Sequence, residues 1–412
     1  MSYGSESEMQ ESATVAGPFS GVRVLDLGHV LAGPFAATLL GDFGADVIKV
    51  ERIGEGDAAR MIGPQTESGP VWWKSLARNK RSIALDWTGA EGRVVLKRLV
   101  ECSQVLIENF RPGVLERNGL SPAVLHEWNE NLVILRISGY GQTGPYSGRP
   151  GFGKPAEALS GVVHLTGMRD GPPMHAGFAL GDMSAGLMGA YGVSMALFAI
   201  ERGIAKGQII DLPIYEAPMR LLDYHIPVST GCAYIPRRNG NQQPMGLGLS
   251  GIFRSNDDRW ISYSAATLAT ARRVLRLVGG DRLAGDPRFS SIAGISEHDT
   301  EINVQVEKWM GRHAAETIIK EFSDAAAVAA MVYDAKDILA DPHIAERGSA
   351  VGVPGETMKV VAPVPKLSAT PGKVKWLGPA KVGQDGVDIL KSIIGLQDEE
   401  IENLIKSHVI GA

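Results

Sequence analysis

The chain has 412 residues, a length that predicts two compact domains, each large enough to bury a core. Its net charge of −5 is small and its basic residues are spread along the chain, which argues against nucleic acid as the main partner. Cys102 and Cys232 are the only cysteines, too few for a disulfide framework, so we expect a reduced, cytoplasmic setting. An anionic ligand would therefore have to bind at a local basic patch.

Two segments of the sequence were compared with signal peptides and membrane spans. Residues 1–16 are polar and acidic and lack the charged and then apolar pattern of a signal peptide, which predicts a disordered N-terminal lead. The most apolar stretch, 184–200, is interrupted by glycines and is shorter than a usual bilayer span, which predicts a buried helix. We therefore expect neither secretion nor a membrane anchor.

Short apolar runs alternate with helical patterns through the first half of the chain. Runs that are apolar nearly throughout are typical of parallel strands covered on both faces, so we expect a Rossmann-like α/β domain with a mostly parallel sheet. The expected strands are 22–27, 45–50, 81–85, 105–108, 132–137 and 208–214, and the expected helices between them include 35–43 and 91–101.

The composition then shifts to Pro, Arg, Asn, Gln and Gly over 234–250, which marks a second domain. This domain is predicted to be smaller and α+β, with a strand over 260–264 and helices over 267–278 and 301–312. The predicted organisation is a lead over 1–16, a large domain over 17–225, a small domain over 226–334 and a C-terminal segment over 335–412 that ends in a helix over 386–407.

Asp182 is the strongest candidate for chemistry. It follows Gly181 directly and precedes the long apolar stretch. A lone carboxylate at the start of a helix is well placed to act as a nucleophile. An aspartate in this position is also a common helix N-cap, and the two roles are compatible because N–H groups at a helix end keep a carboxylate charged.

The spacing of 246–251 matches the G-x-G-x-x-G pattern of dinucleotide sites. That fingerprint requires a strand before it and a helix after it, whereas Pro244 precedes this segment and the strand-like pair Ile252 and Phe253 follows it. A nicotinamide or flavin role is therefore disfavoured. A flexible loop that closes over a substrate and an ordinary turn both remain open.

Other candidate side chains give weaker signals. His29 follows the first expected strand, where α/β sites gather, although a histidine that stabilises a turn is the more common outcome. His164 and His175 flank no acid or cysteine at catalytic spacing, and no serine elbow or metal motif is present, which disfavours hydrolase and metalloenzyme functions. Arg111 precedes Pro112 at an expected helix start, an arrangement that suits a phosphate or ordinary solvated charge.

Taken together, these segments resemble the class III coenzyme A transferases, which include formyl-CoA transferase and carnitine CoA-transferase and are related to α-methylacyl-CoA racemase. The resemblance runs from about Gly21 to the C-terminus. It is carried by 21–27, 32–34, 44–51, 79–82, 108–113, 139–141 and 181–182.

The resemblance implies that Asp182 attacks an acyl-CoA thioester and forms first an aspartyl anhydride and then an aspartyl-CoA thioester, from which CoA passes to a carboxylic acid. N–H groups near the helix start would stabilise the oxyanions. Coenzyme A and acyl-CoA enter as substrates, the wider family suggests succinyl-CoA as donor, and no prosthetic group is implied. The family fold is a homodimer of interlocked ring-shaped subunits in which the C-terminal segment returns to the large domain.

The resemblance also assigns binding residues. A glycine loop that includes Gly246, Leu247 and Gly248 would shield the reactive intermediate from water. The implied CoA contacts are Leu31, Ala32, Arg52, Leu85, Asp86, Trp87, Thr88, Asn109, Phe110, Arg111 and Arg117.

Three differences between this sequence and the proteins it resembles limit the substrates and reactions to be expected. Leu31 stands where formyl-CoA transferase has glutamine, and the glycine run is shorter, which argues against formate and oxalate as substrates. The racemases pair their aspartate with a histidine in a Gly-His-Asp turn, and the matching residues here are Gly151, Phe152 and Gly153. Because Phe152 cannot move a proton, an acyl-CoA racemase is the weaker alternative, and a non-catalytic CoA-binding scaffold is the third.

Overall fold

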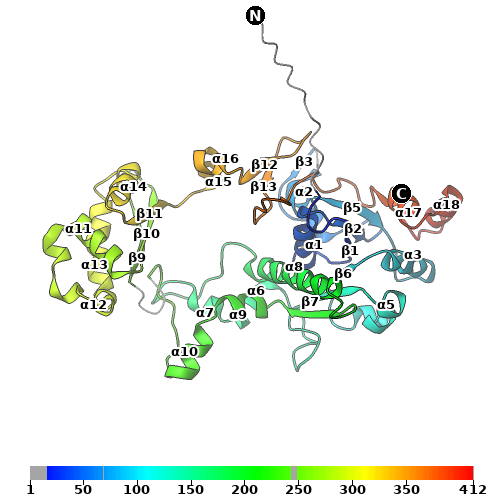
Figure 1. The fold of residues 1–412 in the computed structure, drawn as a ribbon, viewed down its shortest axis with the longest axis horizontal. Coiled ribbons are helices and arrows are strands. Elements are labelled where there is room, and N and C mark those ends of the chain that lie inside the picture. Colours follow the sequence, from blue (N-terminus) through cyan, green and yellow to red (C-terminus); the bar gives the residue numbers. More distant parts are fainter. Residues whose placement is uncertain (1–15, 68, 243–247, 412) are drawn as a thin grey trace, which may run out of the picture. The chain divides into compact units, whose positions relative to one another are not determined.

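The computed structural model describes residues 16–67, 69–242 and 248–411 (Figure 1). The described chain forms two compact units. Unit 1 takes its residues from Met1–Ser160, Gly177–Leu221 and Gly348–Ala412, and unit 2 from Gly161–Ala176 and Leu222–Arg347. Residues 1–15 of the predicted N-terminal lead lie outside the described residues.

A six-stranded parallel sheet forms the framework of unit 1, as the apolar runs predicted. The strand order is β5-β2-β1-β6-β7-β8. The register places Val24 of β1 beside Val47 of β2 and Val105 of β6. The strands are β1 (Arg23–Asp26), β2 (Asp46–Glu51), β5 (Lys80–Ala84), β6 (Val105–Glu108), β7 (Val133–Ser138) and β8 (Ile209–Pro213).

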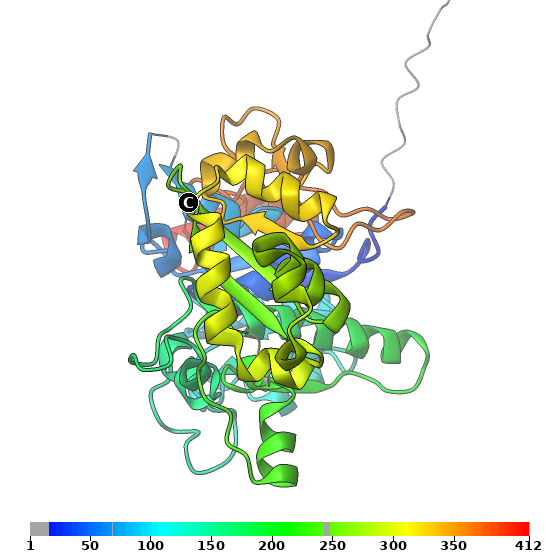
Figure 2. The same ribbon diagram turned by 90° about the vertical axis from the view of Figure 1, so that its left-hand side faces the viewer.

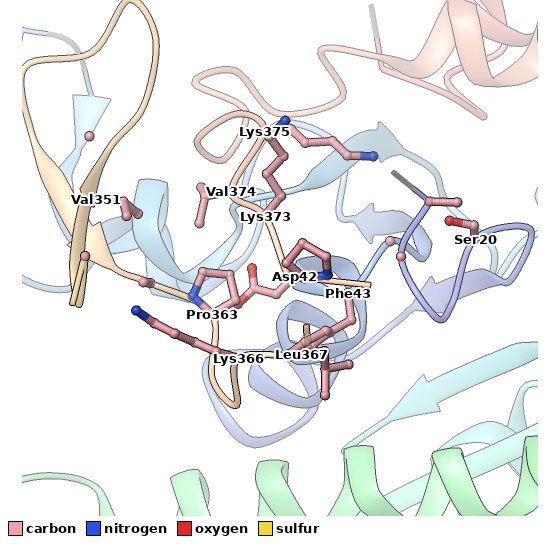
Figure 3. Close-up of a pocket in the computed structure, with 18 of the residues that line it drawn as sticks. Ser20, Asp42, Phe43, Val351, Pro363, Lys366, Leu367, Lys373, Val374 and Lys375 are labelled. Atoms are coloured by element: carbon pink, nitrogen blue, oxygen red, sulfur yellow. The ribbon is translucent and has the colours of Figure 1, made fainter. Parts of the chain in front are cut away.

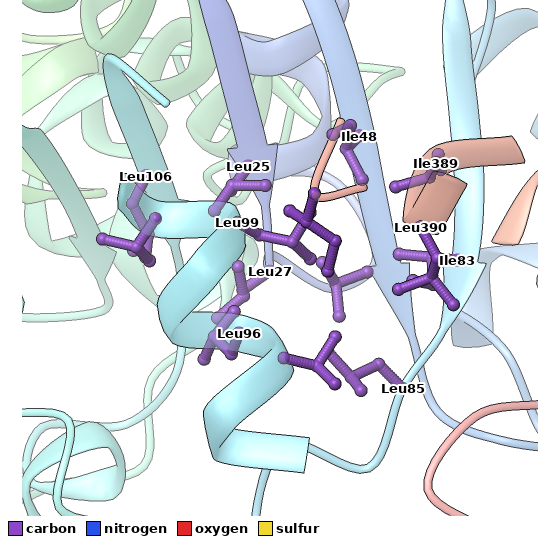
Figure 4. Close-up of a cluster of buried hydrophobic side chains, with 14 of the residues drawn as sticks. Leu25, Leu27, Ile48, Ile83, Leu85, Leu96, Leu99, Leu106, Ile389 and Leu390 are labelled. Atoms are coloured by element: carbon purple, nitrogen blue, oxygen red, sulfur yellow. The ribbon is translucent and has the colours of Figure 1, made fainter. Parts of the chain in front are cut away.

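Helices cover both faces of this sheet, which explains why its strands are apolar on both sides. Leu25 of β1 belongs to one layer of buried side chains and its neighbour Val24 belongs to the other. Figure 4 shows the first layer, in which Leu25 lies with Leu99 of α3 and Ile389 of α17. The first layer is covered by α3 (Ala90–Glu101), α5 (Pro122–Trp128), α17 (Gly386–Ser392) and α18 (Asp398–Lys406), and the second by α1 (Ala32–Asp42) and α8 (Leu180–Glu201).

Helix α8 packs very closely on its neighbours because glycines face them. A Cβ at Gly186 would lie 2.8 Å from Phe35 Cδ1, and one at Gly189 would lie 2.8 Å from Leu135 Cδ2. By length and composition, α8 is the one described helix that could span a membrane. Here it lies on α1 and the sheet, while Leu187, Tyr191, Met195 and Phe198 along another side are at least half exposed.

Unit 2 contains a three-stranded antiparallel sheet with the order β11-β10-β9, against which helices pack (Figure 2). Its core includes Ile261 and Tyr263 of β10, Val306 of α13 and Phe322 of α14. The elements of unit 2 are α7 (Val162–Leu165), α10 (His225–Cys232), β9 (Leu249–Arg254), β10 (Trp260–Ala265), α11 (Leu268–Ala284), η3 (Pro287–Phe289), α12 (Ile292–Glu297), α13 (Asp299–Met310), α14 (Ala315–Asp324), β11 (Val328–Met331), α15 (Ala335–Ala340) and α16 (Pro342–Glu346).

Unit 1 also contains short elements that join the sheet strands and the C-terminal segment. Two small antiparallel pairs, β3 with β4 and β12 with β13, are among them. These elements are η1 (Ala58–Met61), β3 (Gln65–Thr66), β4 (Gly69–Pro70), α2 (Val71–Leu76), α4 (Val114–Arg117), α6 (Gly153–Leu159), α9 (Glu216–Leu221), β12 (Ala350–Gly352) and β13 (Lys359–Val361).

Two helix boundaries differ from the sequence predictions. The closing helix expected over 386–407 is two helices, α17 and α18, and Gly395 between them has a left-handed φ of +67°. Helix α8 begins at Leu180, so Asp182 is the third residue of the helix, and Ala179 occupies the N-cap position without a side-chain hydrogen bond. Asp182 is therefore not an N-cap.

Candidate active site

The sheet gathers the residues that the resemblance assigns to CoA binding. Because β5, β2, β1 and β6 are adjacent and parallel, their carboxyl ends lie at the same edge of the sheet, which we call the carboxyl edge. Leu85, Asp86, Trp87 and Thr88 follow β5, Arg52 follows β2, Leu31 and Ala32 follow β1, and Asn109, Phe110 and Arg111 follow β6, with Arg117 at the end of α4.

Asn109 joins two of the loops at this edge. Its Oδ1 accepts a hydrogen bond from the backbone N–H of His29 at 2.6 Å, and its Nδ2 donates to the carbonyl oxygen of His29 at 2.8 Å. The Phe110 ring lies 5.4 Å from the His29 ring and 5.7 Å from the Trp87 ring, measured between centroids. The loops after β1, β5 and β6 are thus held together by one amide and one aromatic ring.

The arginines near the carboxyl edge are accessible to an anionic ligand. The Arg52 side chain is 72% exposed, and its Nη1 lies 3.5 Å from Oε2 of Glu55, which is itself exposed. Arg111 and Arg117 are exposed, and within the described chain neither makes an ion pair. Exposed guanidinium groups without a carboxylate partner suit phosphate recognition.

Asp182 is a half-buried carboxylate in the first turn of α8. Burial raises its pKa to about 6, the negative charge of Glu157 adds to the rise, and the positive charge of Lys154 opposes it. A Cβ at Gly153 would lie 2.1 Å from Asp182 Oδ2, so no larger residue fits beside the carboxylate. At neutral pH most molecules therefore carry an ionised Asp182 that is more basic than an ordinary carboxylate.

Glu157, on α6, is the neighbour of Asp182 that the sequence analysis missed. Its side chain is fully buried, and Oε1 accepts a hydrogen bond from the backbone N–H of Gly181 at 3.1 Å. Its Oε2 accepts from Lys154 Nζ at 3.1 Å, and Lys154 Nζ also donates to the carbonyl oxygen of Phe178 at 3.0 Å. The only signal in the sequence was a lysine three residues before a glutamate, a spacing typical of exposed helix surfaces.

The backbone N–H groups at the start of α8 already have partners. Those of Leu180, Gly181 and Met183 donate to Phe178 O, Glu157 Oε1 and Ala179 O, respectively. The N–H of Asp182 hydrogen-bonds its own carboxylate and so opposes the rise in its pKa. These N–H groups are engaged within the chain, and their use for oxyanions stays a prediction.

An apolar cluster connects the carboxyl edge with the start of α8. Its buried members are Leu31, Ala59, Trp73, Leu76 and Ala77. Ala179 and Met183, which flank the first turn of α8, pack against this cluster, and so does Val30 from the loop after β1. The loop after β1 at the carboxyl edge and the first turn of α8, which carries Asp182, thus pack against the same apolar cluster.

The remaining candidates are placed as follows. Burial, followed by the charge of Lys49, lowers the pKa of His29, so its ring is neutral at neutral pH. His164 and His175 belong to unit 2. Gly246 and Leu247 lie outside the described residues, and Gly248 has a left-handed φ of +104° just before β9. In the described residues, no group of three or more His, Cys, Asp or Glu could hold a metal.

A hollow of about 980 Å³ in unit 1 lies at the opposite edge of the sheet (Figure 3). Ser20, which precedes β1, and Phe43 and Gly44, which precede β2, line it together with Lys366 and Lys373 of the C-terminal segment. None of the predicted site residues lines this hollow. Ligands of parallel α/β sheets bind at the carboxyl ends of the strands, so the carboxyl edge with Asp182 is the better candidate site.

The titration of Asp182 tests this electrostatic environment. We expect its carboxyl group to titrate with a midpoint of about 6 in ¹³C NMR spectra of aspartate-labelled protein, with Asp182→Asn identifying the signal. Glu157→Gln should lower the midpoint because it removes a nearby negative charge, and Lys154→Met should raise it because it removes a positive one. Shifts in the same direction for both variants would contradict this account.

The chain is similar in sequence to a protein family and to individual proteins of known name. A family model described as CoA-transferase family III matches residues 19–386. The chain is 39% identical over 397 residues to a succinyl-CoA--D-citramalate CoA-transferase from Chloroflexus aurantiacus, a match that covers 95% of this chain and 98% of that protein. It is 38% identical over 406 residues to the succinyl-CoA--L-malate CoA-transferase beta subunit of the same organism, with 97% and 100% covered.

A solved structure of a CAIB/BAIF family protein from Brucella suis matches the fold with a TM-score of 0.81 at 28% sequence identity, and the match covers 92% of this chain and 100% of that chain. The six-stranded parallel sheet and its helices are thus shared with a known α/β fold. The family model and both relatives span nearly all of the chain, which therefore belongs to CoA-transferase family III and is a class III CoA transferase.

Proposed function

We propose that this CoA transferase moves CoA from succinyl-CoA to a dicarboxylic acid through covalent intermediates on Asp182. The observation that carries the proposal is the half-buried Asp182 carboxylate, whose pKa of about 6 leaves it ionised yet unusually basic at neutral pH. Succinyl-CoA and a hydroxy dicarboxylate are the substrate classes named for the two Chloroflexus relatives. Both free cysteines, Cys102 and Cys232, are exposed, and we place the reaction in the reducing cytoplasm.

In the first half of the reaction, the Asp182 carboxylate attacks the thioester carbonyl of succinyl-CoA. The C–S bond breaks, CoA leaves as thiolate, and an aspartyl–succinyl anhydride forms. The thiolate then attacks the aspartyl carbonyl of this anhydride. Succinate leaves, and Asp182 carries CoA as a thioester.

In the second half, the acceptor carboxylate attacks the aspartyl thioester and expels the thiolate, which gives a mixed anhydride between Asp182 and the acceptor. The thiolate attacks the acceptor carbonyl, and the product acyl-CoA forms as the Asp182 carboxylate is released. No proton is gained or lost overall. Anhydrides and thioesters are both activated acyl groups, so each step exchanges one activated group for another.

We propose that CoA binds along the carboxyl edge, where Arg52, Arg111 and Arg117 are exposed and suit its phosphates. The glycine segment that includes Gly248 would cover the intermediates. A racemase reaction is disfavoured because Phe152 is 70% exposed and has no acid–base group, and because no side chain fits at Gly153 beside Asp182.

The covalent step is testable by mass spectrometry of protein incubated with succinyl-CoA. A CoA adduct on the peptide that contains Asp182, converted to a hydroxamate by hydroxylamine, is the expected result. Asp182→Ala should abolish transfer and the adduct while it retains CoA binding. If Asp182 is never modified and deuterium from heavy water enters the α-position of a branched acyl-CoA, the racemase alternative replaces this proposal.

The space at Gly153 gives a second test. Gly153→Ala places a methyl group where Asp182 Oδ2 lies, so the carboxylate must move, and we expect kcat to fall roughly a hundredfold. Gly148→Ala is a matched control in the same segment, because no atom lies within 4 Å of the added Cβ, and it should keep normal activity. Equal activity of the two variants in a steady-state transfer assay would contradict the proposed role of the Asp182 position.

We also propose a homodimer. Helix α8 exposes an apolar stripe formed by Leu187, Tyr191, Met195 and Phe198. No residue of α10 is buried. Apolar area of this kind is typical of surfaces that bind another chain. Light scattering should give twice the mass of the chain, and Tyr191→Glu with Phe198→Glu should lower it to a single chain. If the purified wild-type protein has the mass of one chain, the homodimer is contradicted, and the protein is either a monomer or pairs with a related second subunit.

A further inference from the structure

Four charged side chains form a fully buried chain beneath the carboxyl edge of unit 1. Lys80 Nζ lies 2.9 Å from Asp26 Oδ2, Asp26 Oδ1 lies 3.8 Å from Lys49 Nζ, and Lys49 Nζ lies 3.1 Å from Asp57 Oδ2. None of the four side chains is exposed. The two cations and two anions alternate, so the charges compensate one another, and we call this set the buried charge chain.

The protonation states of Lys49 and Asp57 follow from this arrangement. Burial disfavours a charged Lys49, but Asp26 and Asp57 outweigh burial and raise the pKa of its ammonium group. Burial disfavours an ionised Asp57 as well, but Lys49 and the backbone N–H groups of Ala59 and Val30 together outweigh burial and lower the pKa of that carboxyl group. Both groups are therefore charged at neutral pH.

The buried charge chain holds the backbone of the turn after β1, residues 28–31. Asp26 Oδ1 accepts a hydrogen bond from the N–H of Gly28 at 3.0 Å, and Lys49 Nζ donates to the carbonyl oxygen of Gly28. Asp57 Oδ1 accepts from the N–H of Val30 at 3.0 Å. Side chains from β1, β2 and the start of η1 thus fix a turn that has no regular secondary structure of its own.

This turn is strained. Val30 has a φ of +64°, in the left-handed region, where a β-branched residue is a clear outlier. Such a conformation persists only where surrounding contacts hold it, and it is concentrated at functional sites. The contacts that hold it here are the hydrogen bond that the Val30 N–H donates to Asp57 and the two hydrogen bonds between Asn109 and the adjoining His29 backbone.

The strained turn contacts the same apolar cluster as the start of α8. Leu31, its last residue, is one of the implied CoA contacts and is buried in the apolar cluster that Ala179 and Met183 also contact. Val30 packs against the same cluster. A shift of this turn would therefore move the CoA edge relative to the first turn of α8, which carries Asp182.

Stability alone does not explain the four charges. Buried ion pairs are commonly no more stabilising than apolar side chains of the same size, because desolvation offsets their attraction. Apolar side chains, however, could not donate to Gly28 or accept from Val30. Hydrogen bonding to the strained turn is a task that requires the polar groups of Asp26, Lys49 and Asp57, and Lys80 acts on the turn through Asp26.

We propose that Lys49, Asp57, Asp26 and Lys80 are positioning residues that fix the strained turn and thereby set the alignment of the CoA thioester with Asp182. The inference rests on the proposed covalent function of Asp182. It concerns residues that touch neither the thioester nor the attacking carboxylate, so their effect must be transmitted through the turn and the apolar cluster.

The test compares Asp57→Asn with Asp42→Asn. Both remove the charge of a buried carboxylate in unit 1, but Asp42 is paired with Arg78 at the far end of α1. Asp57→Asn should lower kcat for transfer from succinyl-CoA roughly tenfold or more and weaken CoA binding in calorimetry by a similar factor. Asp42→Asn should change both by less than about twofold at a comparable loss of melting temperature.

A second variant covers the case in which Asp57→Asn does not fold. Val30→Gly keeps all four charges and relieves the left-handed strain, but it removes the side chain that links the turn to the cluster. We expect kcat to fall about tenfold. Unchanged kcat and CoA affinity in Val30→Gly would show that the turn does not set the alignment, and equal values in the two Asn variants would show that the buried charge chain is only structural; either result overturns the proposal.

The two proposals fail in distinguishable ways. Wild-type protein that binds CoA but transfers none from succinyl-CoA contradicts the proposed function, while the calorimetric comparison of the two Asn variants still reports on the turn. Wild-type transfer with no difference between those variants contradicts the positioning role alone. Wild-type protein that does not bind CoA contradicts both.

Discussion

The close contact between α8 and α1 is the constraint on which the site depends. A Cβ at Gly186 would lie 2.8 Å from Phe35 Cδ1 and 2.9 Å from Ala32 O, so only glycine lets the two helices approach this closely. Glycine within a helix costs about 1 kcal/mol relative to alanine, and α8 accepts that cost more than once. Because Ala32 begins α1 at the carboxyl edge and Asp182 lies in the first turn of α8, this contact fixes the distance between them.

The ionised form of Asp182 lowers the stability of the fold. Its folded-state pKa of about 6 lies above the unfolded value of 3.8, so the folded protein binds this proton more tightly, and the stability contributed by Asp182 is lost as the pH rises from 3.8 to about 6. Above that range the loss is at most on the order of 3 kcal/mol, and less because the side chain is only half-buried. A carboxylate in such a position is expected where function opposes stability.

Local sequence patterns predicted the framework but not the support of the site. The run 105–108 coincides with β6, and 45–50 falls one residue from β2, because strands buried on both faces are apolar nearly throughout. Glu157 and Asp57 gave no such signal, since each acts on a backbone N–H that only the folded chain brings near: Gly181 for one, Val30 for the other. The start of α8 was misplaced because Ala179 supplies no capping side chain.

The proposed reaction also explains why the nucleophile has two charged neighbours of opposite sign. A more basic carboxylate is a better nucleophile toward a thioester, but it must still be ionised at neutral pH. Glu157 raises the basicity of Asp182, whereas Lys154 limits the rise, and the resulting pKa of about 6 satisfies both conditions. Because Lys154 also donates to Glu157 and to Phe178 O, the same ammonium group holds the chain just before α8 in place. Burial therefore sets most of the basicity of the nucleophile, and one pair of side chains on α6 adjusts that basicity and helps to fix the position of the carboxylate.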